Sequence, residues 1–129
     1  MMIHKVSTTK PITVIDRDLR ASAARHQFGV IAVHDLQDTL RQKGISLGMQ
    51  CQIYEVCNPH QAKKVLEADG AISTALPCRI SVYGDGKTYT LATMLPTAMM
   101  EAFGRPEIAE VAREVEEIIL EMMDDASKG

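Results

Sequence analysis

The sequence is poor in aromatic residues and has no large excess of charge of either sign. It contains no tryptophan, three tyrosines and two phenylalanines, and its formal net charge is −3 with a pI of about 5.8. Nucleic acids and anionic membrane surfaces attract proteins that present a basic face. We therefore expect that neither nucleic acid nor a membrane is a partner of this protein.

Long apolar segments are also missing. No stretch reaches the roughly 18–20 apolar residues that cross a bilayer, and residues 1–10 lack the apolar region of a signal peptide. The three cysteines are an odd number, so they cannot all be paired in intramolecular disulfides. Reduced thiols are typical of the cytoplasm, and we expect a cytoplasmic protein.

The motifs of the common enzyme classes are absent. The sequence has no glycine-rich dinucleotide or phosphate loop, no serine-hydrolase motif and no zinc-protease motif. Gly84-Asp85-Gly86 is typical of a tight turn between two strands rather than of a phosphate-binding loop. We predict no catalytic residue, and we expect a binding protein rather than an enzyme.

What the sequence does contain is a regular alternation of short β-rich and helical segments. Strands are predicted at residues 3–9, 28–34 and 49–56 and in a hairpin over 78–94, and helices at 16–26, 35–44, 58–70, from Pro96 and from Pro106. The order is β-α-β-α-β-α-β-β-α-α. It predicts an α+β fold in two layers, with a largely antiparallel sheet covered by helices, as a single domain over residues 1–129.

Two of the predicted helices carry clear signals at their starts. Asn58-Pro59 combines a favoured N-cap with a proline at the first helical position. Pro11 is equally well placed to start a helix, but the β-branched run 12–15 favours a strand, so the helix is predicted from residue 16. The final helix has an apolar stripe opposite a row of glutamates, which we interpret as a solvated face.

Methionine is abundant, with eight residues. Five of them lie toward the C-terminal end: Met94, Met99, Met100, Met122 and Met123. Methionine fills irregular apolar space and suits adaptable surfaces. These residues are therefore expected in the core or in a dimer interface, and a role as metal or haem ligands is the alternative.

Several motifs in register resemble the DUF302 family of small domains: "VCNP", "AISTALPCRISVY", "DGKT", "PTAMM" and the upstream "FGVIAVHDLQDTL". The resemblance covers about residues 26–124. It implies a compact α+β domain with an antiparallel sheet, a homodimer, and no assigned function, although haem binding has been suggested for some members. We accordingly expect a homodimer with an apolar pocket near its interface that binds a small apolar ligand, with haem as the best candidate.

The first candidate site comprises Cys57, Asn58 and Cys78. Cys57 precedes the N-cap Asn58, where free backbone N–H groups and the positive end of the helix favour a thiolate. Cys78 begins the next strand, and the two cysteines meet if the intervening helix returns the chain antiparallel. Three interpretations are open: packed apolar residues, a contact with a ligand or metal, and a sulfur carrier or redox sensor that uses Cys57 and Cys78.

The second candidate is His34, a possible metal or haem ligand. It ends the most apolar strand, and the following Asp35 is a possible partner that orients the imidazole ring. Haem iron is commonly bound by such a histidine within an apolar slot. The alternative is a structural histidine at the end of a strand.

Overall fold

The computed structural model describes residues 2–128, so the two terminal residues of the predicted domain lie outside the described part. The predicted order of elements is confirmed, with two short 3₁₀ segments added. The strands are β1 (Ile3–Thr8), β2 (Gly29–Asp35), β3 (Gln50–Cys57), β4 (Cys78–Gly84) and β5 (Tyr89–Met94). The helices are α1 (Ile12–Arg25), α2 (Leu36–Gln42), α3 (Pro59–Ala68), α4 (Pro96–Met100) and α5 (Pro106–Ser127), and the 3₁₀ segments are η1 (Gly70–Ala75) and η2 (Glu101–Phe103).

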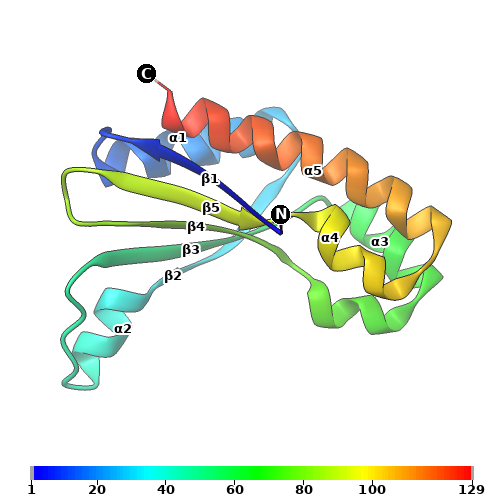
Figure 1. Ribbon diagram of the computed structural model, residues 1–129, viewed down its shortest axis with the longest axis horizontal. Coiled ribbons are helices and arrows are strands. Elements are labelled where there is room, and N and C mark those ends of the chain that lie inside the picture. The colour runs from blue at the N-terminus through cyan, green and yellow to red at the C-terminus, as the bar shows by residue number, and fades with distance from the viewer. Residues whose placement is uncertain (1, 129) are drawn as a thin grey trace.

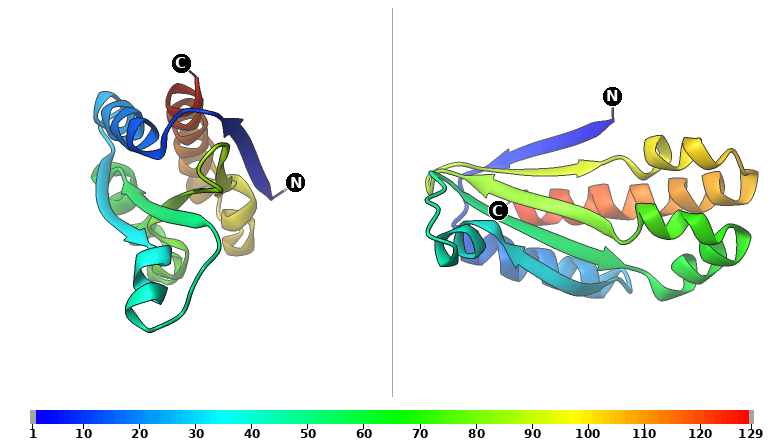
Figure 2. Two further views of the ribbon diagram at one scale, coloured as in Figure 1. Left: turned by 90° about the vertical axis from the view of Figure 1, so that its left-hand side faces the viewer. Right: turned by 90° about the horizontal axis from the view of Figure 1, so that it is seen from below.

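The five strands form one sheet in the order β1-β5-β4-β3-β2, and every neighbouring pair is antiparallel. Helices α1 and α5 cover one face of this sheet, whereas α3 and α4 lie beyond the ends of the strands (Figure 1). Seen from the opposite side, the strands lie in front of α1 and α5, and α2 is the helix on that side (Figure 2). The fold is therefore the predicted α+β class in two layers.

The two faces of the sheet differ in burial because side chains alternate along each strand. The face under the helices is fully apolar at its centre, where Tyr54, Val56, Ile80, Val82 and Leu91 have no exposed surface. The other face, which we call the open face, carries half-buried and exposed side chains. Its members include Ile3, Lys5, His34, Ile53, Glu55, Arg79, Ser81, Tyr83, Ala92 and Met94.

Helix α1 starts four residues earlier than predicted. Pro11 is its N-cap residue, and the β-branched segment from Ile12 to Ile15 is helical. Ile15 and Leu19 are completely buried. Burial of these side chains against the sheet outweighs the weak preference of β-branched residues for a strand.

Helix α5 packs on α1, α3, α4 and β1 and contributes much of the core. Ile119, Met122 and Met123 have no exposed surface, and Met100 of α4 is 7% exposed. Three of the five C-terminal methionines are thus core residues, as expected from their ability to fill irregular space. Met94 differs, since it is 45% exposed on the open face.

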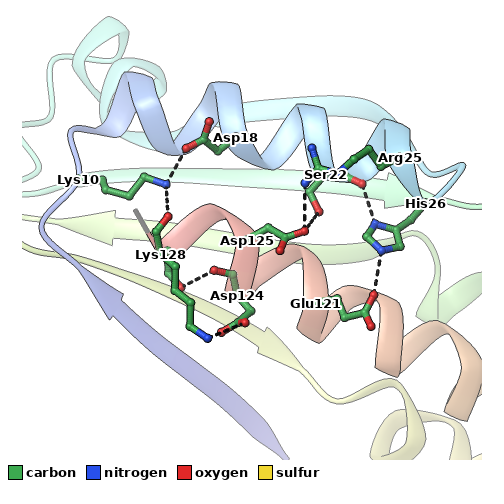
Figure 3. A network of polar contacts seen from close by, with 10 residues as sticks. Lys10, Asp18, Ser22, Arg25, His26, Glu121, Asp124, Asp125 and Lys128 are labelled. Carbon is green, nitrogen blue, oxygen red and sulfur yellow. Dashed lines mark hydrogen bonds and ion pairs between the residues drawn. The ribbon is translucent and has the colours of Figure 1, made fainter.

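Polar side chains join α1 to α5 where the two helices lie side by side (Figure 3). Ser22 Oγ donates to Asp125 Oδ2 at 2.7 Å, and Arg25 lies 3.1 Å from the same oxygen. The hydrogen bond from Ser22 and the charge of Arg25 lower the pKa of Asp125 below its ordinary value. His26 Nε2 contacts Glu121 Oε2 at 2.8 Å. These contacts fix the direction of α5, whose first half forms a wall of the candidate site.

The predicted hairpin is confirmed, with β4 ending at Gly84 and β5 starting at Tyr89. A Cβ atom on Gly84 would lie 2.2 Å from the Thr88 carbonyl oxygen, so this position requires glycine. Gly86 has a φ of +99°, which strains residues with a side chain. Asp85 closes the turn by accepting hydrogen bonds from the Lys87 and Thr88 backbone N–H groups.

Candidate functional site

A cavity of about 40 Å³ lies where the ends of β3 and β4 meet α3, α4 and α5. Val56 and Cys78 form its floor on the sheet, and Cys57, Asn58 and Gln61 lie beside the start of α3. The remaining walls are apolar and consist of Phe28, Ala62, Val65, Leu76, Pro96, Met100, Ile108, Val111, Ala112 and Val115. Because Asn58, Gln61 and Ala62 are half-buried, the edge of the cavity formed by α3 is the side nearest to solvent.

Asn58 acts as the predicted N-cap of α3. Its Oδ1 accepts hydrogen bonds from the backbone N–H groups of His60 at 3.0 Å and Gln61 at 3.2 Å. The cap makes the chain turn sharply after Cys57, which is the last residue of β3. The turn places Cys57 and the first turn of α3 on the same cavity.

Cys78 reaches the cavity from the neighbouring strand. It starts β4, follows the cis bond between Leu76 and Pro77, and pairs with Val56 across the antiparallel ladder. Cys57 is one residue beyond this pair, so the predicted antiparallel return of the chain does bring the two cysteines to one place. Three of the four predicted site residues, Cys57, Asn58 and Cys78, therefore line the same cavity.

Cys57 does not have the acidity predicted for it. Burial raises the pKa of Cys57 above its ordinary value, and burial together with the nearby Cys57 raises the pKa of Cys78 to about 11. The prediction that the helix end lowers the pKa of Cys57 is therefore wrong. The physical reason is that Asn58 already caps the first N–H groups of α3, while the apolar cavity removes water that would solvate a thiolate.

We expect slow alkylation of both cavity thiols at neutral pH. The raised pKa of Cys78 leaves it with about one hundredth of the thiolate of an ordinary cysteine, and burial also shields it. Iodoacetamide labelling followed residue by residue with mass spectrometry measures these rates, and an unstructured cysteine peptide is the reference. A Cys57 that reacts faster than the peptide at pH 7 would contradict this assignment.

Gln61 is a cavity residue that the sequence analysis did not identify. Its Nε2 donates to Glu114 Oε2 of α5 at 2.9 Å. Its Oε1 is buried and has no hydrogen-bond partner among residues 2–128. A buried carbonyl oxygen without a partner is unfavourable by about 1–3 kcal/mol. The sequence signal, a glutamine three residues after an N-cap, did not distinguish this side chain from a solvated one.

His34 lies elsewhere, on the open face of edge strand β2. Its side chain is 51% exposed, and its Nε2 contacts Glu55 Oε1 at 3.0 Å. Arg79 contacts the second oxygen of Glu55 at 3.3 Å, and these two partners lower the pKa of Glu55, with His34 the larger cause. The predicted orientation of His34 by Asp35 is wrong, because the Asp35 carboxylate caps α2 by accepting from the Asp38 backbone N–H. His34 does not line the cavity.

Residues 2–128 contain no group of three or more histidine, cysteine, aspartate or glutamate side chains arranged to bind a metal ion. Within the same residues, no helix is both long and apolar enough to cross a membrane.

Comparison with known proteins gives the family of this chain. A family model described as "Domain of unknown function DUF302" matches residues 4–126. The chain is also similar to the crystal structure of an uncharacterized conserved DUF302 protein from Bacillus stearothermophilus, with 25% sequence identity and a TM-score of 0.91 over 99% of both chains. No curated protein matches the chain in sequence. Since the family model covers nearly the whole sequence and the fold agrees throughout, the chain belongs to the DUF302 family.

Proposed function

We propose that this protein binds a small, mainly apolar molecule in the cavity between α3, α4 and α5. The observation that carries the proposal is the composition of the cavity: apolar walls with a few polar groups at one side, contributed by Asn58 and Gln61. Binding sites for small molecules typically combine a concave apolar surface with a small number of placed polar groups. The volume of about 40 Å³ limits the ligand to a few non-hydrogen atoms unless side chains at the edge move.

Cyclopentanol, a small apolar ring with one hydroxyl group, is a suitable probe, and its six non-hydrogen atoms enter the cavity of about 40 Å³ only when side chains at the α3 edge move apart. Its addition should shift the methyl resonances of Val65 and Val111 in a saturable manner, because both side chains line the cavity and are at most 8% exposed. Methyl groups on the open face, such as that of Ile53, serve as the internal reference. Unchanged Val65 and Val111 resonances up to the solubility limit of the probe would refute the proposal.

The alternative proposal is a thiol protein that carries sulfur or senses oxidation through Cys57 and Cys78. It is favoured by the presence of both thiols on one cavity and opposed by the raised pKa of each. All three cysteines are free, which fits the reducing cytoplasm that we propose as the location of the protein.

We also propose a homodimer that forms through the open face of the sheet. Ile3 and Met94 pair across β1 and β5, and each is 45% exposed. The next row of the open face runs through the half-buried Ala92, Ser81 and Ile53, with Lys5 at one end and His34 at the other. The paired, exposed Ile3 and Met94 side chains are apolar groups of the kind that a partner commonly covers. A dimer of this kind leaves the cavity on the helical side of each protomer.

Light scattering in dilute solution should accordingly give twice the chain mass of 14.2 kDa. Met94→Glu should convert the dimer into a monomer, because it introduces two like charges into a symmetric apolar contact. Leu66→Glu is the matched control, since Leu66 is 38% exposed on α3, away from the open face. A wild-type monomer at micromolar concentration, or a Met94→Glu variant that remains dimeric, would contradict the proposed interface.

Haem is a separate candidate ligand, and it fits the open face better than the cavity. The cavity is far too small for a porphyrin, and His34 does not reach it. In a dimer formed through the open faces, the His34 side chains of both copies lie at the interface. The Glu55 carboxylate beside the ring is the kind of partner that commonly fixes a metal-bound histidine.

If haem binds in this way, titration of haemin into the protein should produce a Soret band, and His34→Ala should abolish it without changing the molecular mass. His60→Ala is the matched control, because His60 is exposed on α3 and distant from the open face. No Soret band in the wild-type protein, or an unchanged band in His34→Ala, would exclude His34 as a haem ligand.

A further inference from the structure

One atom of the cavity has a hydrogen-bonding requirement that the described residues leave unmet. Gln61 lines the cavity, and its Oε1 is buried without a partner among residues 2–128. Most buried side-chain oxygens in folded proteins accept at least one hydrogen bond from protein or bound molecules. The unpaired oxygen of Gln61 therefore indicates that the cavity recognises a hydrogen-bond donor.

The orientation of the Gln61 amide is set from outside the cavity. Its Nε2 donates to Glu114 Oε2 at 2.9 Å. The reversed amide would place Oε1 against the carboxylate, and two acceptors without a proton between them repel each other. Glu114 thus holds the amide with its N–H group toward α5 and its carbonyl oxygen in the buried position.

The other groups of the cavity do not supply the missing donor. Asn58 caps α3 through its acceptor Oδ1, and its Nδ2 donor makes no hydrogen bond to Gln61 Oε1. The Cys57 and Cys78 thiols line the same cavity, but neither makes a hydrogen bond to Gln61 Oε1. The aliphatic walls offer no donor at all.

We propose that the ligand of this cavity carries a hydrogen-bond donor, a hydroxyl or amide N–H on a small apolar body, which donates to Gln61 Oε1. This inference rests on the proposed function and narrows the ligands to one chemical class, small apolar molecules with a hydrogen-bond donor. Ligands with only an acceptor at the same place bind more weakly, because a carbonyl or ether oxygen would face the Gln61 oxygen directly. Glu114 acts as a positioning residue, since it contacts Gln61 rather than the ligand.

Cyclopentanol and cyclopentanone test the proposal because they share a ring and differ in the donor. Dissociation constants are measured from the methyl shifts of Val65 and Val111. The wild-type protein should prefer the alcohol by about tenfold, the effect of one neutral hydrogen bond at a buried acceptor. In Gln61→Met, which keeps an unbranched side chain but has no amide, the ratio should fall to about one. Gln42→Met on the exposed surface of α2 is the matched control and should keep the wild-type ratio.

A second variant is independent of any effect of Gln61→Met on packing. Glu114→Ala removes an exposed side chain and leaves the amide free to turn its N–H group toward the ligand. The ketone should then bind more tightly than it does to the wild-type protein. Equal affinity of the wild-type protein for both compounds, which is the result expected if an ordered water already satisfies Oε1, would overturn the inference while leaving cavity binding intact. A preference that persists unchanged in Gln61→Met would do the same. If neither compound binds, the proposed function itself fails.

Discussion

Replacing Ala62 with leucine is expected to reduce the affinity for cyclopentanol by at least about tenfold. Ala62 lies on α3 at the edge of the cavity, where it is half-buried. Leucine adds three carbon atoms to a space of about 40 Å³, so the side chain and a bound ring cannot both be accommodated. Leucine is also a good helix former, and α3 itself should remain intact. Methyl chemical shifts of Val65 and Val111 report the binding.

Ala109→Leu provides the matched control for this substitution. Ala109 is exposed on α5, so the same chemical change there leaves the cavity unaltered. The control should bind cyclopentanol with the affinity of the wild-type protein. The free energies of unfolding of both variants should lie within about 1 kcal/mol of the wild-type value. Binding to Ala62→Leu with wild-type affinity would place the ligand outside the cavity.

Ile119→Ala should have the largest effect on stability, with a loss of about 3 kcal/mol in the free energy of unfolding. Ile119 has no exposed surface and belongs to the half of α5 that packs on α1 and the sheet. Truncation removes three buried carbon atoms and leaves a void that the tightly packed sheet face fills poorly. Urea unfolding followed by circular dichroism measures the change.

The corresponding change at an exposed isoleucine is the control. Ile45→Ala should alter the free energy of unfolding by less than about 0.5 kcal/mol, because Ile45 is 53% exposed in the loop after α2. A similar loss for both variants, or a loss below about 1 kcal/mol for Ile119→Ala, would show that α5 is not the principal support of the core.

The order of elements could be predicted from the sequence because local signals marked most of the boundaries. Asn58 is the N-cap that its residue type indicated. The start of α1 could not be predicted in the same way, because the β-branched residues from Ile12 to Ile15 become helical through tertiary burial. Propensity is a weak effect compared with the packing of an apolar face.

The candidate site was predictable in part. The antiparallel pairing of β3 and β4 on either side of the capped helix α3 brings together Cys57, Asn58 and Cys78. The position of a helix between the two cysteines in the sequence had suggested this arrangement. The acidity of Cys57 depended on how much water reaches its sulfur, which one sequence does not reveal. The partner of His34 could not be predicted either. Glu55 is 21 residues away in the sequence and contacts His34 only because of the register between β2 and β3.

Nuclear Overhauser effects between cyclopentanol and the protein test the central claim most directly, because they locate the ligand. We expect intermolecular effects from the ring protons to the methyl groups of Val65, Val111 and Val115, which line the cavity from α3 and α5. Effects to Ile53 or Met94 alone, on the open face of the sheet, would contradict it.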